Sequence, residues 1–191
     1  MIVVKDEAER LAEDRLQRMP ADIDAMRALV LTAVAQEDYA KAHTLDEKII
    51  AEGKAEPNDL NSVAWHSLYI GKVLDSDFEH ALKAAELSQK NSSIMHTLAC
   101  IYAERGKTKE AREVLVQAMD QMNLDEPDAD YWYGLGRIAE ADGERDIAIA
   151  DYNKVEKPKE SWQVPDSTFR LAQMRLKMMS AASSQIAGTS R

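Results

Sequence analysis

A pair made of a large and then a small apolar residue recurs four times along this chain of 191 residues. The pairs are Leu29-Val30, Val63-Ala64, Leu98-Ala99 and Leu135-Gly136, and their first members are 34, 35 and 37 residues apart. A period in this range is typical of solenoids built from short helical repeats. Each repeat of this kind buries its apolar face by stacking on its neighbours. The period therefore predicts stacked helix pairs rather than a globular enzyme.

A second spacing places a small residue in the other helix of a pair. Ala42, Ala111 and Ala148 each follow the large member of their pair by 13 residues. Ala81 departs from this rule, because it follows Val63 by 18 residues. We therefore expect an insertion in the second pair and a second helix that is about one turn short, so that the two changes nearly cancel.

Two units resemble the tetratricopeptide repeat. One has Trp132, Leu135 and Gly136, followed through Gly143 by Ala148 and Tyr152. The other runs from Ser92 to Met119 and carries Leu98, Ala99, Tyr102, Gly106, Ala111, Leu115 and Ala118. The resemblance implies an all-α fold, a right-handed α-solenoid of helix-turn-helix repeats with about four full repeats and a half repeat at each end.

We expect these units to form a single domain over residues 1–191. They are an N-terminal half repeat at 1–20, repeat 1 at 23–56, an irregular repeat 2 at 57–91, repeat 3 at 92–125, repeat 4 at 128–160, a C-terminal capping helix at 165–182 and a frayed tail at 183–191. In repeat 2 the helices are expected at 58–74 and 78–90. The capping helix should cover the fourth pair, and Trp162, between Pro158 and Pro165, should pack on that pair or form an exposed interaction site.

The first expected helix looks like the second half of a repeat, because Ala8 lies 34 residues before Ala42 and Pro20 follows the helix. Either it continues a longer protein, or it is an N-terminal cap. The stretches 60–65 and 96–102 are similar to repeats in bacterial proteins with a transglutaminase-like domain. That similarity implies an alternative function, in which the chain is the non-catalytic C-terminal repeat segment of a larger bacterial enzyme.

The charge balance argues against two classes of partner. Asp and Glu number 34 against 24 Lys and Arg, for a net charge of -10, which disfavours binding to nucleic acid and to anionic membranes. No apolar run approaches the roughly 18 residues of a membrane span, and residues 1–6 do not resemble a signal peptide. We expect a soluble chain with a reduced Cys100, cytoplasmic by default, or periplasmic or secreted if it belongs to an exported protein.

The sequence has no pattern typical of catalysis or metal binding. The histidines, His43, His66, His80 and His96, fall on four expected helices, and no two share the i, i+4 spacing of the His-Glu-x-x-His zinc motif. We therefore expect no metal, no cofactor and no enzymatic activity. His96 and Cys100 do have i, i+4 spacing, so a Cys/His nucleophile pair stays open beside the simpler interpretation of two packed neighbours.

The acidic loop at residues 124–128 is expected to cap a helix rather than to bind calcium. Carboxylates before a helix accept hydrogen bonds from its free N–H groups. An EF-hand loop needs a central Gly and a terminal Glu, and this loop has a Pro and no such Gly.

The resemblance also indicates a binding surface, because the first helices of successive tetratricopeptide repeats line a concave groove. Carried over by register, the candidate contacts are Arg27 and Leu31 in repeat 1, Asn61, Trp65 and Tyr69 in repeat 2, His96 and Cys100 in repeat 3, and Tyr133, Arg137 and Glu140 in repeat 4. Glu104 shares the face of His96 and Cys100. The Lys and Asn clamp with which some members hold chaperone tails is not reproduced.

Trp65 is the leading contact, because Asn61 and Tyr69 lie one turn on either side of it. The alternative is that Trp65 packs against a neighbouring repeat or the loop near Asp75. The sequence thus predicts a protein-interaction module that holds a peptide or a partner domain in its groove. A monomer is favoured, although self-association through the groove or an uncapped end stays open.

Overall fold

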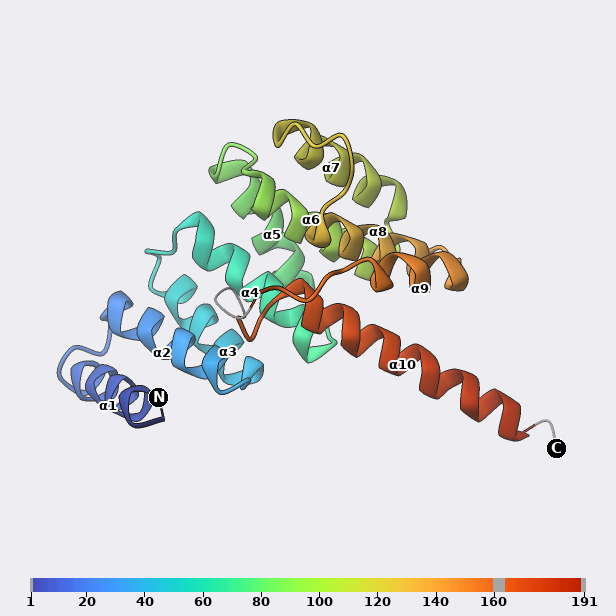
Figure 1. Ribbon diagram of the computed structural model, residues 1–191. Helices are drawn as coiled ribbons and strands as arrows, with labels where there is room; N and C mark the ends of the chain where they lie inside the picture. Colours follow the sequence, from blue (N-terminus) through green and yellow to red (C-terminus); the bar gives the residue numbers. More distant parts are fainter. Residues whose placement is uncertain (1, 160–163, 190–191) are drawn as a thin grey trace.

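Helices make up most of the chain that the computed structural model describes, which is residues 2–159 and 164–189, with side chains at 7–159 and 164–181 (Figure 1). The helices are α1 Ile2–Arg18, α2 Ile23–Ala35, α3 Tyr39–Ala51, α4 Pro57–Ile70, α5 Asp75–Leu87, α6 Ser92–Glu104, α7 Thr108–Gln121, α8 Ala129–Ala141, α9 Arg145–Asn153 and α10 Thr168–Thr189. No strand occurs in these ranges. The predicted all-α helical-repeat solenoid is confirmed.

The large and small apolar pairs lie midway along α2, α4, α6 and α8, where each helix meets its neighbours. Val63, Ala64 and Ala99 are almost completely buried. At Gly136 the approach is closer, because a Cβ there would lie 2.6 Å from Cε1 of Tyr152. The period in the sequence therefore corresponds to a row of close contacts between stacked helices. None of the helices within the described ranges is both long and apolar enough to cross a bilayer.

The second helix pair is irregular in a different way from the one predicted. α4 ends at Ile70, before the predicted residue 74, and Gly71 takes a left-handed conformation with φ of 73°. α5 begins at Asp75 and has 13 residues, as many as α3. The extra chain therefore lies in the turn 71–74, which is longer than the turns 36–38, 105–107 and 142–144, and the predicted short helix was wrong.

Phe78 explains why the spacing of small residues fails in this pair. It stands at the place in α5 where α3, α7 and α9 have alanines. Its ring packs edge-on against Tyr102 at a centroid distance of 5.2 Å, and the Arg105 guanidinium lies 4.9 Å from the ring centroid. α5 instead uses Ala81 and Ala84, which are buried, to pack closely.

Side chains that precede several helices cap them. Asp22 accepts a hydrogen bond from Ala25 N at 3.0 Å. Asp128 Oδ1 accepts hydrogen bonds from the backbone N–H groups of Asp130 and Tyr131, at 3.0 and 3.2 Å. The prediction that the acidic loop caps a helix is thus confirmed for Asp128, because its carboxylate satisfies N–H groups in the first turn of α8.

The end of the chain turns back over the array. After α9 the chain runs back toward α4, where α10 begins, and α10 then runs along α8 and α9 (Figure 1). The helix continues to Thr189, beyond the predicted end at residue 182. Trp162 lies outside the described residues. This reversed course brings residues 164–170 next to helices that are far away in the sequence.

Candidate functional site

Residues 164–170 lie on the face formed by α4, α6 and α8 together with Tyr39 at the start of α3, which we call the groove face. Three aromatic side chains of α3 and α4 donate hydrogen bonds to three successive carbonyl groups of this segment. The bonds run from Tyr39 Oη to Pro165 O at 2.6 Å, from Trp65 Nε1 to Asp166 O at 2.9 Å, and from Tyr69 Oη to Ser167 O at 2.7 Å. The groove face therefore binds the main chain of the segment.

The side chains of the segment add two further contacts. Thr168 Oγ1 donates to Asp130 Oδ1 at 2.5 Å. Arg170 forms a two-pronged ion pair with Glu37, at the turn between α2 and α3. The segment thus spans the groove face from α8 to the start of α3.

The three donors support one another. The rings of Tyr39 and Tyr69 are stacked with centroids 4.1 Å apart, and Trp65 meets Tyr69 edge-on at 6.2 Å. Burial raises the pKa of Tyr39 to about 12, and burial also raises the pKa of Tyr69 well above its usual value. Both phenols are therefore protonated at neutral pH and act as hydrogen-bond donors.

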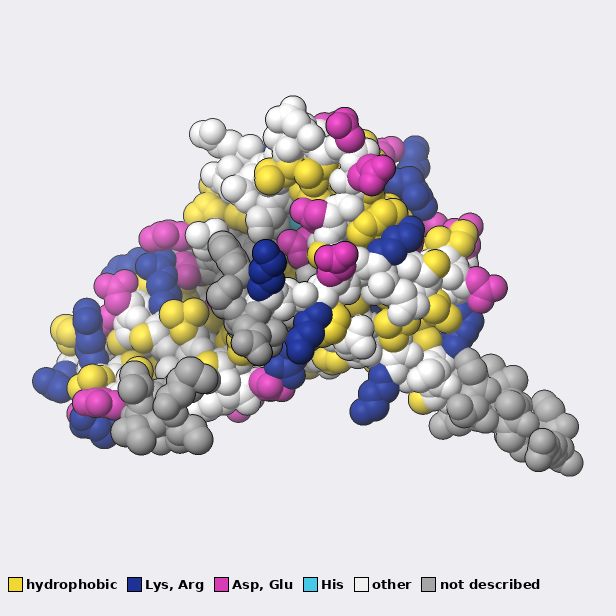
Figure 2. All heavy atoms as spheres, viewed as in Figure 1, with side chains coloured by type: hydrophobic (Ala, Val, Ile, Leu, Met, Phe, Trp, Pro, Cys, Tyr) yellow, Lys and Arg dark blue, Asp and Glu magenta, His cyan; other side chains and the backbone are white. Residues whose placement is uncertain are grey.

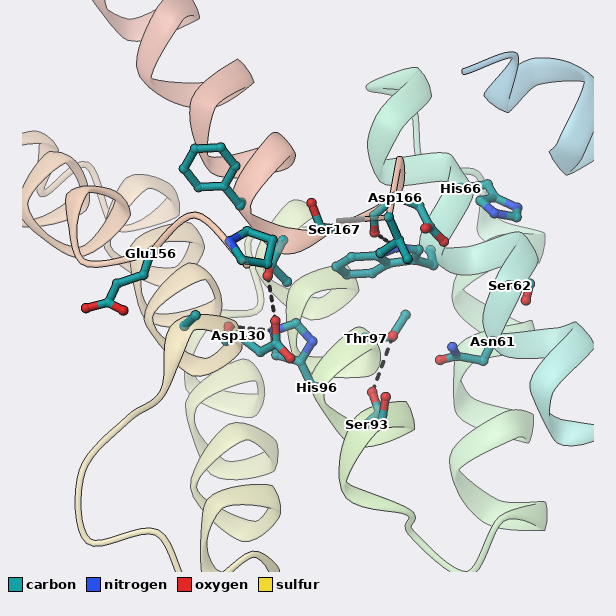
Figure 3. A pocket seen from close by; sticks show the side chains of 16 residues that line it. Asn61, Ser62, His66, Ser93, His96, Thr97, Asp130, Glu156, Asp166 and Ser167 are labelled. Atoms are coloured by element: carbon teal, nitrogen blue, oxygen red, sulfur yellow. Dashed lines mark hydrogen bonds between the residues drawn. The ribbon is translucent and has the colours of Figure 1, made fainter. Parts of the chain in front are cut away.

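A pocket of about 420 Å³ lies between the segment and the groove face (Figure 3). Asn61 and Trp65 of α4 line one side, and His96 of α6 and Asp130 of α8 line the other, with Ser93 and Thr97 between them. Among the described residues, Oδ1 of Asn61 is a buried acceptor with no hydrogen-bond partner. Polar side chains therefore line much of the pocket.

The other end of the groove face holds a network of buried charges. Arg137 is 3% exposed and lies 2.5 Å from both Glu104 and Glu140. Arg175 of α10 makes a two-pronged ion pair with Glu140, and the Tyr152 hydroxyl donates to Glu140 at 2.6 Å. Burial alone would raise the pKa of Glu140, but the hydrogen bonds from Arg175 and Tyr152 hold it below its usual value.

The structure brings together only part of the predicted contact set. Asn61, Trp65 and Tyr69 line the segment or its pocket, and His96 lines the pocket floor. Trp65 is half-buried: its ring lies near those of His96 in repeat 3 and Tyr133 in repeat 4, and its N–H is bound to the C-terminal segment rather than to the loop near Asp75.

The remaining predicted contacts lie elsewhere. Cys100 and Tyr133 are buried under the groove face, and Arg137 and Glu140 belong to the charge network, so placing them as free groove contacts was wrong. The cause is that α10 and close packing cover positions which the repeat register leaves open. Leu31 is 70% exposed and not in contact with the segment in the described residues, and Arg27 is paired with Asp59 and Glu56.

Sequence reasoning missed Tyr39, Asp130 and the segment itself. Tyr39 lies at the start of a second helix, whereas the predicted contacts all lie on first helices. The signal that could have found the segment is the run of polar and proline residues before α10, which is typical of a turn.

The His96 and Cys100 pair does not have the environment of a nucleophile. Sγ of Cys100 lies 3.7 Å from Nε2 of His96, which donates to the Asp130 carbonyl at 2.8 Å. Burial raises the pKa of the Cys100 thiol and lowers the pKa of His96. The thiol is therefore protonated and unreactive at neutral pH, which favours the interpretation of two packed neighbours.

The surface in the view of Figure 2 mixes positive and negative side chains. Lys and Arg alternate with Asp and Glu over this face, and hydrophobic side chains lie among them. This distribution does not form the single basic patch by which proteins bind nucleic-acid phosphates.

The sequence of the third and fourth pairs matches a known repeat. Residues 92–120 and 129–157 each match the profile of the family described as "Tetratricopeptide repeat". This chain contains tetratricopeptide repeats. The matched ranges comprise α6 with α7 and α8 with α9, the two units whose residues carried the resemblance.

Solved structures of tetratricopeptide-repeat proteins have the same fold. YrrB, described as a TPR protein with an unusual peptide-binding site, is similar with a TM-score of 0.64 and 17% identity over 92% of this chain and 85% of that chain. A tetratricopeptide repeat protein from Parabacteroides merdae is similar with a TM-score of 0.53 and 17% identity over 90% and 66%. No curated protein matches the sequence. These comparisons give no support to a link with transglutaminase-like proteins and indicate no catalytic family.

Proposed function

We propose that this tetratricopeptide-repeat chain is a protein-interaction module whose groove face binds a peptide segment of a protein partner. The observation that supports this most is the set of three hydrogen bonds from Tyr39, Trp65 and Tyr69 to consecutive carbonyl groups. The bonded carbonyl groups belong to a turn at residues 165 and 166 and to the residue before α10. Bonds to the main chain do not depend on the side chains of a ligand, while pockets supply the specificity. Peptide binding is also what the name of the similar protein YrrB describes.

On this proposal, residues 164–170 are an internal ligand that a partner displaces. A segment tethered to its own site has an effective concentration in the millimolar range. A partner therefore has to make contacts that the internal segment does not make. The pocket beside the segment supplies room for them, and its polar lining, which includes Asn61, Ser93 and Asp130, supplies groups for hydrogen bonds.

The contacts of the internal segment indicate the chemistry of the partner. Its proline lacks an N–H that would otherwise need an acceptor, and Thr168 and Arg170 reach the carboxylates of Asp130 and Glu37. A partner should thus contain a turn with a proline, followed by a helical turn that carries a hydroxyl side chain and then a basic side chain, as residues 165–170 do. An acidic side chain in place of the basic one would be repelled by Glu37.

The test uses the full chain with the internal segment released. In this released variant, residues 164–167 are replaced by Gly-Ser-Gly-Ser and Arg170→Ala is added, which keeps the hydrophobic contacts of α10. A fluorescent peptide with the sequence of residues 164–171 should bind the released variant and bind the unmodified chain at least about tenfold more weakly, because the internal segment competes. Fluorescence anisotropy gives both affinities.

Matched variants test whether the groove face is the site. In the released background, Trp65→Phe with Tyr69→Phe keeps an aromatic ring at each position, although a smaller one at residue 65, and removes both donors. It should weaken peptide binding at least about tenfold if each bond contributes about 1 kcal/mol. Tyr102→Phe removes a hydroxyl from a ring that packs on Phe78, and should leave the affinity unchanged. Equal binding by all these variants, or no binding by the released variant, would show the proposal to be wrong.

A further inference from the structure

We propose that His43, Glu47, Asp77 and His80 form a binding site for a divalent transition-metal ion of the zinc class, between α3 and α5. The site is separate from the groove face and does not depend on the proposed function.

The spacing places two ligands on each helix. His43 and Glu47 are four residues apart on α3, and Asp77 and His80 are three residues apart on α5. Residues three or four apart on a helix project from the same face. The zinc motif sought in the sequence has two histidines on one helix. A site in which each of two helices contributes one imidazole and one carboxylate does not have that motif.

The distances suit a shared ion. One potential ligand atom from each of His43, Glu47 and Asp77 lies within 4.8 Å of the other two. Nε2 of His43 is 2.7 Å from Oδ1 of Asp77, and Nε2 of His80 is 3.6 Å from Oε1 of Glu47. Four ligands at about 2.0 to 2.2 Å from a tetrahedral zinc ion are about 3.3 to 3.6 Å apart. Small side-chain rotations therefore bring His43, Glu47 and Asp77 around one ion. His80 lies outside this group of three and contacts Glu47, so it becomes the fourth ligand only by a larger rotation toward the ion.

Burial fixes part of the site and leaves an entrance. Asp77 is completely buried, and its Oδ2 accepts a hydrogen bond from Leu74 N at 2.7 Å, which orients Oδ1 toward His43. Hydrogen bonds of this kind to the second oxygen of a carboxylate hold a metal ligand in place. The side chain of Glu47 is 37% exposed, so an ion can enter from solvent on the side of this carboxylate.

The donor set decides the class of ion. Two imidazole nitrogens and two carboxylate oxygens suit zinc and related ions, whereas calcium and magnesium prefer shells made of oxygen. The two carboxylates balance the charge of a divalent ion. Binding would replace the His43 and Asp77 hydrogen bond by two metal bonds and would tie the first full helix pair to the second.

The test is titration of the metal-free full chain with Zn²⁺ alone, followed by calorimetry. One Zn²⁺ should bind per chain, the melting temperature should rise with Zn²⁺ concentration, and Mg²⁺ at the same concentrations should have no effect. Co²⁺ in place of Zn²⁺ should give the intense visible absorption of a tetrahedral complex. Binding of Mg²⁺ as tight as that of Zn²⁺ would contradict the proposed donor set.

Paired variants locate the ion. Glu47→Gln and His80→Gln should each weaken Zn²⁺ binding by about tenfold or more, because even an outer-shell change costs that much. Glu52→Gln and Glu79→Gln, which change exposed residues of the same two regions, should leave the affinity unchanged. Circular dichroism checks that each variant is folded. Unchanged binding in the double variant His43→Gln and His80→Gln, or loss of binding in Cys100→Ala, would overturn the proposal.

Discussion

The C-terminal part of the chain is attached to the repeat array at two places, and the two attachments differ in kind. Residues 165–167 are held by neutral side chains that donate to carbonyl groups. The ion pair of Arg170 with Glu37 adds a contact there that solvent screens, because both side chains are exposed. α10 is held at Arg175 by the charge network of Arg137 and Glu140. A neutral hydrogen bond contributes about 1 kcal/mol because water or another peptide can replace it, whereas a buried charge left alone costs several kcal/mol. The first attachment is therefore exchangeable, and the second is permanent.

The largest effect is expected at the permanent attachment. Arg137→Ala leaves the carboxylates of Glu104 and Glu140 without their buried partner, and should lower the free energy of unfolding by about 3 to 5 kcal/mol. Urea denaturation measures this value. Arg112→Ala is the control, because Arg112 is half exposed in its 3.6 Å pair with Asp142 and should change stability by less than about 1 kcal/mol. Equal losses in the two variants would remove the distinction between the attachments.

A smaller effect is expected where α8 meets the same network. Gly136→Ala places a methyl group 2.6 Å from the Tyr152 ring, which Arg137 and Glu140 hold in position, so the variant should be destabilised by about 1 to 3 kcal/mol. Gly134→Ala is a matched control on the same helix. Its methyl group meets the end of the Leu115 side chain at 2.9 Å, a less severe contact than that of Gly136 with the Tyr152 ring, and the gain in helix propensity of up to about 1 kcal/mol partly offsets it. Thermal unfolding compares the two, and a more stable Gly136→Ala variant would contradict the rigid packing described.

The smallest effect is expected at the exchangeable attachment. Tyr39→Phe removes the hydrogen bond to Pro165 and should cost about 0.5 to 1.5 kcal/mol of local stability. The amides of Arg170 and Leu171, which bond to Ser167 O, should exchange with deuterium several-fold faster. The midpoint of global unfolding should change little. A global loss as large as that of Arg137→Ala would mean that the segment is part of the core.

The sequence predicted the features that arise from contacts between neighbouring repeats. The large and small pairs identify α2, α4, α6 and α8, because a small residue is needed where a side chain from the next helix approaches the helix backbone closely. Gly136, which faces the ring of Tyr152, is an example. The spacing of 13 residues to the small residue of the second helix predicted the irregularity of the second pair at the wrong place. At the expected position in α5 the chain has Phe78, which is large and packs against Tyr102.

The candidate site was predicted less well than the fold. The helical spacing of Asn61, Trp65 and Tyr69 identified one side of the groove face, since a common face follows from position on one helix. The other side comes from residues 101 positions beyond Trp65 and 126 beyond Tyr39. Those contacts depend on the path of the chain after α9, on which a periodic pattern carries no information. Burial of Cys100 and Tyr133 likewise follows from packing of later elements.

The hydrogen bond between Tyr39 and Pro165 has a consequence for how the molecule folds. An array of repeats has mainly local contacts, so its units can form and melt in succession along the chain. Here Pro165, which precedes the last helix, contacts Tyr39 in the first full helix pair, and the contact closes a loop of 126 residues. Contacts between residues so far apart form late in folding, because the loop entropy must be offset first. The first and last repeats should therefore melt together while this loop is closed, and independently once it opens.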